Sequence, residues 1–209
     1  MSYRNALVLI TAMFIVLMFL IVPLLTSHLG SIWGSFTVFL IYWFFFCLPL
    51  GWFFQRNGAV RRNLSLALGG ANWVPWAVAA QITLIAVASW FMLPENVPLI
   101  AMILAFTFGT LNGFLEEFFW RGAFLEQGRG NMSFQLLGVG LFTLWHVPLV
   151  LAHGVHYEGG PAALIGGALF LGIFWFWIAN RTDRIGWSVV AHMFTNVIAF
   201  VGHITVNFV

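Results

Sequence analysis

Two adjacent glutamates and an arginine, Glu116, Glu117 and Arg121, occur in a stretch of sequence that is otherwise apolar. Because 62% of the residues are hydrophobic and only 7% are charged, the composition indicates a membrane protein. Ionisable side chains inside a membrane are usually retained for function. On an α-helix Glu117 and Arg121 share one face and can form an ion pair, whereas Glu116 lies about 140° away from Arg121. The spacing predicts that the arginine holds Glu117 and leaves Glu116 for chemistry. A purely structural ion pair between helices is the alternative.

Two later stretches carry further polar groups of catalytic type. His146 follows Phe142 by four residues and Asn196 follows His192 by four, so each pair lies on one face of a helix. Alone, each histidine is more often a hydrogen-bonded interior residue than a catalytic one. Together with Glu116, the two histidines and the amide are a set of groups suited to hydrolysis by water.

Each of these groups has a predicted role. We expect Glu116 to take a proton from a water molecule that His146 helps to position. His192 and Asn196 would donate hydrogen bonds to the oxyanion that develops on the attacked carbonyl group. The neighbouring ion pair would fix the helix that presents the catalytic carboxylate. Such a mechanism needs no serine or cysteine nucleophile.

The elements that must position these residues are membrane helices. The 209 residues include 24 Phe and 11 Trp, and the mean hydropathy is +0.98, which is too apolar for a soluble domain of this size. We therefore predict an all-α fold, a polytopic membrane helical bundle of about seven transmembrane helices. The predicted spans are residues 5–25, 32–54, 73–93, 98–125, 134–153, 161–180 and 185–207. The net charge of +2 is too slight for a nucleic-acid surface, so the lipid bilayer is the expected environment.

The positions of the arginines predict the orientation in the membrane. Arg4 precedes the first span, and the other loop arginines fall in every second connection: Arg56, Arg61, Arg62, Arg129, Arg181 and Arg184. The remaining connections contain no arginine. By the positive-inside rule the N-terminus is cytoplasmic and the C-terminus is outside, in a multi-pass protein of the cell membrane.

The same orientation gives each polar motif a depth. At 1.5 Å per residue, Glu116 lies about 14 Å from the cytoplasmic end of its span and His146 about 18 Å. His192 lies about 10 Å and Asn196 about 16 Å from that side. The motifs on three helices thus fall at one level, in the cytoplasmic half of the membrane. A shared interior cavity explains that agreement.

An E-E-x-x-x-R stretch, then F-x-x-x-H, then H-x-x-x-N, in this order on successive membrane helices, resembles the CAAX-protease and bacteriocin-processing family of intramembrane endopeptidases. The resemblance covers roughly residues 100–200. It implies a helical bundle that cuts a peptide bond of a membrane-associated protein or peptide. The implied catalytic residues are Glu116, His146, His192 and Asn196.

The resemblance also implies three supporting residues, Glu117, Arg121 and Phe142. The first three spans match the family only as generic membrane helices. We therefore divide the chain into N-terminal accessory helices, residues 1–97, and a catalytic helical core, residues 98–209. The chain is short for the family, so accessory helices of its eukaryotic members are expected to be absent.

Two alternatives to a metal-free peptidase stay open at this point. Glu116, His146 and His192 could bind Zn²⁺ with one open position for water, as in a metalloprotease. No H-E-x-x-H helix is present, and the amide of Asn196 is a poor zinc ligand, so we expect no cofactor. The other alternative is a non-enzymatic immunity or transport protein, although no internal repeat supports a transporter.

A second group of histidines falls at the predicted outer side. His153 and His203 lie in or near span ends, with His156 and Glu158 in the adjoining connection and His28 in another. A metal or proton-sensing site here would require His153 and His203 to approach each other or His156. We favour the simpler interpretation, which is histidines scattered at the membrane interface.

Overall fold

The computed structural model describes residues 2–55 and 58–208. Within these residues every regular element is a helix, so the predicted all-α fold is confirmed. The elements are α1 (Tyr3–Leu40), the π-helix η1 (Ile41–Cys47), α2 (Leu48–Phe54), α3 (Ala59–Asn63), α4 (Val74–Trp90), α5 (Leu99–Glu116), the π-helix η2 (Glu117–Arg121), α6 (Gly122–Gln127), α7 (Met132–Leu149), α8 (Gly160–Thr182) and α9 (Gly186–Phe208).

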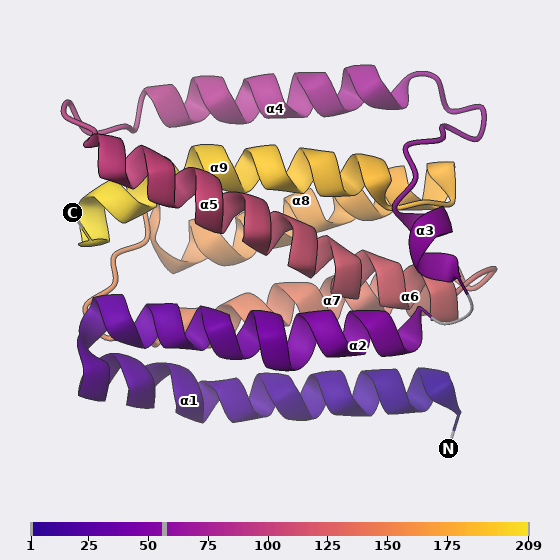
Figure 1. The fold of residues 1–209 in the computed structure, drawn as a ribbon, viewed down its shortest axis with the longest axis horizontal. Helices are drawn as coiled ribbons and strands as arrows, with labels where there is room; N and C mark the ends of the chain where they lie inside the picture. Colours follow the sequence, from indigo (N-terminus) through magenta and orange to yellow (C-terminus); the bar gives the residue numbers. More distant parts are fainter. Residues whose placement is uncertain (1, 56–57, 209) are drawn as a thin grey trace.

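The first two predicted spans form a helical hairpin that turns at Gly30. This glycine has φ +79°, a conformation that side chains with a Cβ rarely adopt. Beyond the turn, a Cβ on Gly34 would lie 2.5 Å from the Cα of Thr26, so the two legs touch. Further along, Phe14 stacks on Phe46 with ring centroids 3.8 Å apart, which keeps the same antiparallel register. The second leg continues through η1 and α2, as Figure 1 shows.

The helices have the lengths of a multi-pass membrane protein. Five helical stretches in the described residues are long and apolar enough to cross a bilayer: Tyr3–Phe54, Leu99–Gln127, Met132–Leu149, Gly160–Thr182 and Gly186–Phe208. The first contains both legs of the hairpin, and α4, with 17 residues, is slightly shorter than the rest. Each of the seven apolar segments predicted from the sequence therefore coincides with helix.

Helices α5 and α9 meet through glycines. A Cβ on Gly109 would lie 2.6 Å from the backbone nitrogen of Val197, and one on Gly113 would lie 2.7 Å from the Cα of Met193. Small residues spaced by four let two backbones approach in this way. The acidic end of α5 is consequently held against the first half of α9.

The connections that carry arginine gather at one end of the bundle, which we call the arginine end. Here Arg62 pairs with Glu126 at 2.5 Å, and Arg129 bridges Glu126 and Asp183. Arg129 also donates a 2.9 Å hydrogen bond to Asn63. The opposite end, which we call the far end, consists of the hairpin turn, residues 91–98, residues 150–159 and the last turn of α9 (Figure 1).

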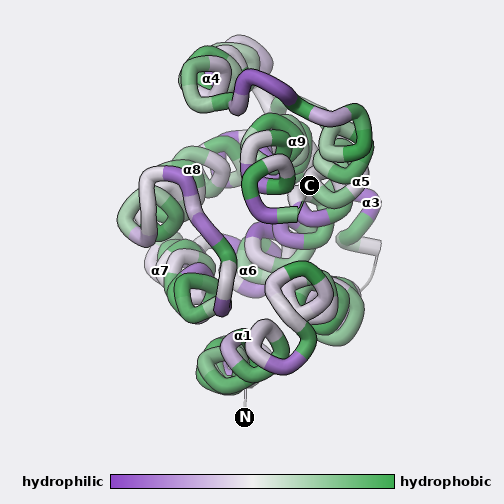
Figure 2. The backbone as a smooth tube through the Cα atoms, turned by 90° about the vertical axis from the view of Figure 1, so that its left-hand side faces the viewer, coloured by the Kyte–Doolittle hydropathy of each residue, from purple (hydrophilic) through white to green (hydrophobic). Residues whose placement is uncertain are grey.

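Viewed from the far end, the helices are arranged around the middle of the bundle. Figure 2 shows the hairpin, α5, α7, α8 and α9 arranged around it, with α4 packed outside α9. The helices are mainly hydrophobic, and the hydrophilic residues concentrate in the connections. This arrangement directs one face of each surrounding helix toward the interior.

Candidate active site

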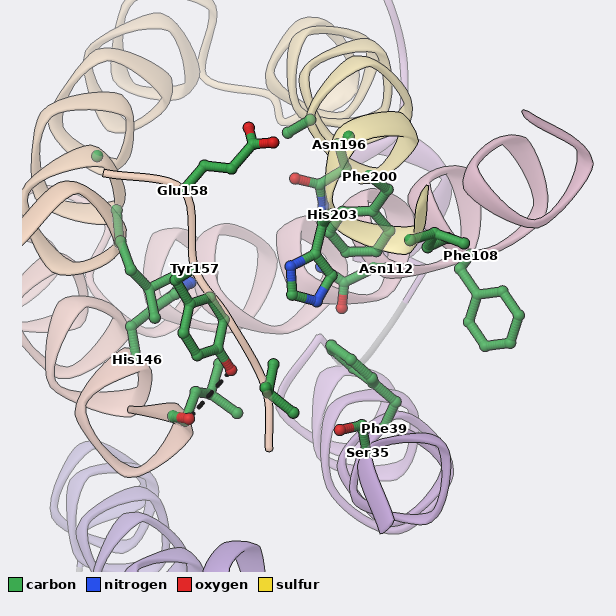
Figure 3. A pocket seen from close by; sticks show the side chains of 18 of the residues that line it. Ser35, Phe39, Phe108, Asn112, His146, Tyr157, Glu158, Asn196, Phe200 and His203 are labelled. Carbon is green, nitrogen blue, oxygen red and sulfur yellow. Dashed lines mark hydrogen bonds between the residues drawn. The ribbon is translucent and has the colours of Figure 1, made fainter. Parts of the chain in front are cut away.

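The interior contains a cavity of about 700 Å³ lined by side chains from the hairpin, α4, α5, α7, α8 and α9. Its walls are mainly apolar and aromatic (Figure 3). The four residues predicted to be catalytic all line this cavity: Glu116, His146, His192 and Asn196. Phe142, one of the predicted supporting residues, lines it as well. The other two predicted supporting residues, Glu117 and Arg121, lie behind its wall.

The Glu116 carboxylate is only 2% exposed and is contacted on both oxygens. Its Oε1 accepts hydrogen bonds from the Tyr42 hydroxyl at 2.7 Å and the Trp145 indole at 3.3 Å. Its Oε2 accepts one from the Asn112 amide at 3.0 Å and lies 3.3 Å from His192 Nε2. Contacts from four directions hold this carboxylate in one orientation at the base of the cavity.

Two of the groups around Glu116 are themselves fixed by aromatic side chains. The Tyr42 hydroxyl accepts a 2.5 Å hydrogen bond from the Trp120 indole. Asn112 Oδ1 accepts a 2.7 Å hydrogen bond from the Trp43 indole. Tyr42 and Trp43 both lie in η1, and π-helical turns of this kind are frequent at functional sites.

Neither Tyr42 nor Trp43 was predicted from the sequence to have a role in the site. The sequence did contain a signal for them, a Tyr-Trp pair in the middle of an apolar span. Buried tyrosine and tryptophan need hydrogen-bond partners for their polar atoms, so such a pair indicates a polar contact inside the bundle. The division of the chain at residues 97 and 98 remains a prediction. The hairpin that it describes as accessory nevertheless supplies Tyr42, which contacts Glu116.

The predicted contact between Glu117 and Arg121 is present. Arg121 Nη1 lies 3.0 Å from Glu117 Oε1, and both side chains are almost completely buried. The guanidinium lies over the Phe142 ring at 4.2 Å and near the Trp175 ring at 5.4 Å. Phe142 thus separates the ion pair from the cavity. The segment is a π-helix, not the regular α-helix that the spacing argument assumed.

The two glutamates are less separate than the helical spacing predicted, because His192 contacts both. Its Nδ1 lies 3.0 Å from Glu117 Oε1 and its Nε2 lies 3.3 Å from Glu116 Oε2. The imidazole is held from the side by Trp175, with ring centroids 3.7 Å apart. His192 of α9 therefore links Glu116, the last residue of α5, to Glu117, the first residue of η2. The spacing within one helix cannot predict a contact made by another helix.

His146 and Asn196 present groups to the cavity that are not used by Glu116. His146 Nδ1 lies 2.9 Å from the carbonyl oxygen of Phe142, which favours the tautomer with the proton on Nδ1 and leaves Nε2 as an acceptor. Asn196 Nδ2 is buried and has no hydrogen-bond partner among the described residues. A buried amide donor without a partner is uncommon and is suited to a group brought by a substrate.

The zinc alternative requires Glu116, His146 and His192 to converge as ligands. Over residues 2–55 and 58–208, no group of three or more His, Cys, Asp or Glu side chains is placed to hold a metal ion. The Glu116 carboxylate is instead surrounded by hydrogen-bond donors. The donor set therefore does not fit a zinc centre.

The far-end histidines are held by neighbouring residues of the same end. His203 stacks on Tyr157, with ring centroids 5.4 Å apart, and the backbone of His156 pairs with the Asn207 side chain. In the part of the chain that the structure describes, no metal-binding group includes these residues or His153. Among the described residues the metal site considered for this end is therefore not formed, and the proton-sensing site stays a prediction.

Comparison with known proteins adds one match. Residues 98–198 match the family model described as type II CAAX prenyl endopeptidase, Rce1-like. The matched region extends from the start of α5 through most of α9 and contains all three sequence motifs. No curated protein and no solved structure matches the chain.

Proposed function

Because residues 98–198 match the family model of Rce1-like type II CAAX prenyl endopeptidases, we propose that the chain hydrolyses a peptide bond of a membrane-associated protein or peptide. The observation that carries this proposal is the arrangement at the base of the cavity. There an oriented carboxylate, Glu116, shares one space with the unpartnered amide donor of Asn196. Hydrolysis by an activated water molecule needs two groups: a general base, and a hydrogen-bond donor that stabilises the oxyanion.

The proposed reaction uses water as the nucleophile. Glu116 accepts a proton from a water molecule that also donates a hydrogen bond to Nε2 of His146. The water oxygen forms a bond to the carbonyl carbon, and the carbonyl oxygen becomes an oxyanion that Asn196 Nδ2 stabilises. The C–N bond then breaks, and Glu116 returns the proton to the leaving amine.

The contacts of His192 support a positioning role for this residue. Both of its ring nitrogens face carboxylates, so donation to the oxyanion would require Nε2 to leave Glu116. We propose that His192 holds the two glutamates in register and that Asn196 is the main oxyanion donor. The sequence-based expectation gave both residues the oxyanion role.

The ion pair behind the wall has no direct part in this reaction. Neither Glu117 nor Arg121 lines the cavity, and Phe142 covers the Arg121 guanidinium on the cavity side. The pair lies within the π-helical turn that follows Glu116. We propose that this pair sets the position of the catalytic carboxylate. No metal ion is required by the proposed steps.

Peptide cleavage by the purified protein tests the function. The protein in detergent is incubated with a panel of peptides that contain apolar segments, and new termini are identified by mass spectrometry. We expect defined cleavage that disappears in Glu116→Ala and persists in Glu95→Ala, which removes an exposed acid far from the site. Absence of cleavage by the wild-type protein across the panel would favour a non-enzymatic binding protein.

A further inference from the structure

The cavity extends from the proposed catalytic residues in one direction only. The lining residues that belong to α5, α8 and α9 fall within residues 104–116, 163–175 and 192–208 respectively. Because α5 and α8 run toward the arginine end and α9 runs away from it, all three sets lie on the far-end side of Glu116 and His192. The catalytic level is thus the closed base of the cavity.

Toward the arginine end the base is closed by packed aromatic and charged side chains. Trp175 stacks on His192 at 3.7 Å, and Phe142 is covered from behind by the Arg121 guanidinium at 4.2 Å. Glu117 pairs with that guanidinium and contacts His192 as well. A peptide cannot reach Glu116 from this side without disrupting the buried ion pair.

The open direction reaches the far end of the bundle. Residues of the hairpin turn region and of the 150–159 connection line the cavity there, among them Trp33, Val155 and Tyr157. The Tyr157 hydroxyl donates a 3.0 Å hydrogen bond to the Leu149 carbonyl oxygen, and burial raises the pKa of Tyr157. This hydroxyl therefore stays a neutral donor that ties the rim to α7 (Figure 3).

The two ends differ in charge. The described arginines outside the candidate site lie at the arginine end, whereas the far end carries the acids Glu95 and Glu158. Glu158 lines the cavity, with its carboxylate 3.1 to 3.3 Å from where a Cβ on Gly202 would lie. By the positive-inside rule the arginine end faces the cytoplasm, which places the open end of the cavity outside.

We propose that the substrate is an extended apolar peptide segment presented on the outer side of the membrane, and not a cytoplasmic chain terminus. This inference rests on the proposed function. Residues 104 to 116 of α5 correspond to about 18 Å along the helix. At about 3.3 Å per residue, some five or six residues of an extended peptide reach from the rim to Glu116. The aromatic walls, which include Phe39, Phe108 and Phe200, match apolar side chains of such a segment.

Sidedness can first be tested by cysteine labelling. The wild-type chain has one cysteine, Cys47, which is completely buried and serves as the blank. Val155→Cys places a thiol in the cavity at the far end, and Ser133→Cys places one in the first turn of α7 at the arginine end. In right-side-out membrane vesicles a membrane-impermeant maleimide is expected to label Val155→Cys and not Ser133→Cys. The reverse pattern would overturn the proposal.

Substrate access is then measured with the peptide that the purified protein cleaves fastest. The peptide is added to right-side-out and to inverted vesicles that contain equal amounts of the protein. We expect at least tenfold faster cleavage by right-side-out vesicles, and equal rates once detergent opens both preparations. Equal rates in intact vesicles, or faster cleavage by inverted ones, would overturn the proposal. Absence of cleavage even in detergent would count against the proposed function, and the labelling result would still decide the side.

Discussion

The Tyr42 hydroxyl donates a 2.7 Å hydrogen bond to Glu116 Oε1, although the two residues are 74 positions apart in the sequence. The contact joins the second leg of the hairpin, which lies outside the residues that the family model matches, to the end of α5, which lies inside them. Because Trp120 donates to the same hydroxyl, the phenol proton is directed at the carboxylate. Through this hydrogen bond the hairpin helps to orient the carboxylate of Glu116, the proposed general base.

Removing this hydroxyl tests the link. Tyr42→Phe keeps the ring and its stacking on Trp145, so the fold is expected to stay intact. Loss of a hydrogen bond to a charged group corresponds to about 1.5–3 kcal/mol, which we expect as a roughly 10- to 100-fold fall in kcat. The matched control is Tyr3→Phe, half exposed at the N-terminus, which should keep wild-type turnover. Unchanged kcat in Tyr42→Phe would refute the link.

Asn196 is expected to contribute to the transition state without contributing much to stability. Its Nδ2 has no partner among the described residues, so Asn196→Ala removes no hydrogen bond of that atom. Loss of an oxyanion donor lowers kcat by about 10²- to 10³-fold. We expect that fall together with a melting temperature close to the wild-type value. A large loss of stability with normal kcat in the surviving protein would contradict the oxyanion role.

Much of the fold was predictable because each membrane span depends only on the composition of its own stretch of sequence. Apolar length predicts a membrane helix, and the alternating arginine loops predicted which connections share an end of the bundle. Gly30 shows what such local signals leave out. Its positive φ closes the hairpin tightly enough for Phe14 and Phe46 to stack, and no span prediction places those rings together.

The candidate site was predictable in part for the same reason. Spacing of four indicated the contact between Glu117 and Arg121, which depends on one helix alone. The contacts of His192 with both glutamates depend on how closely α9 approaches α5, which Gly109 and Gly113 permit. The G-x-x-x-G spacing was present in the sequence as a signal for that approach.

The ion pair behind the wall predicts a stability defect of its own. Glu117→Gln leaves the buried Arg121 guanidinium without its carboxylate, and breaking a buried pair in this way costs about 3–5 kcal/mol. We expect a melting temperature lower by roughly 10 °C, measured on the purified protein in detergent. Arg62→Gln removes a half-exposed ion pair and should have an effect of at most about 1 kcal/mol. Equal melting temperatures for the two variants would contradict the structural role of Glu117.

Metal removal separates the two hydrolytic mechanisms. The donors around Glu116 do not form a zinc centre, so we expect full peptidase activity after exhaustive chelation. Elemental analysis of the purified protein should give less than one zinc per chain. Loss of activity on chelation, followed by recovery on addition of Zn²⁺, would establish the metalloprotease alternative.

Turnover by Glu116→Gln is the most direct test of the central claim. The amide has nearly the shape of the carboxylate but cannot accept the proton of an attacking water. We predict that peptide cleavage by the purified variant falls below detection while its helical circular dichroism remains near that of the wild type. Wild-type turnover by the correctly folded variant would show that Glu116 is not the general base.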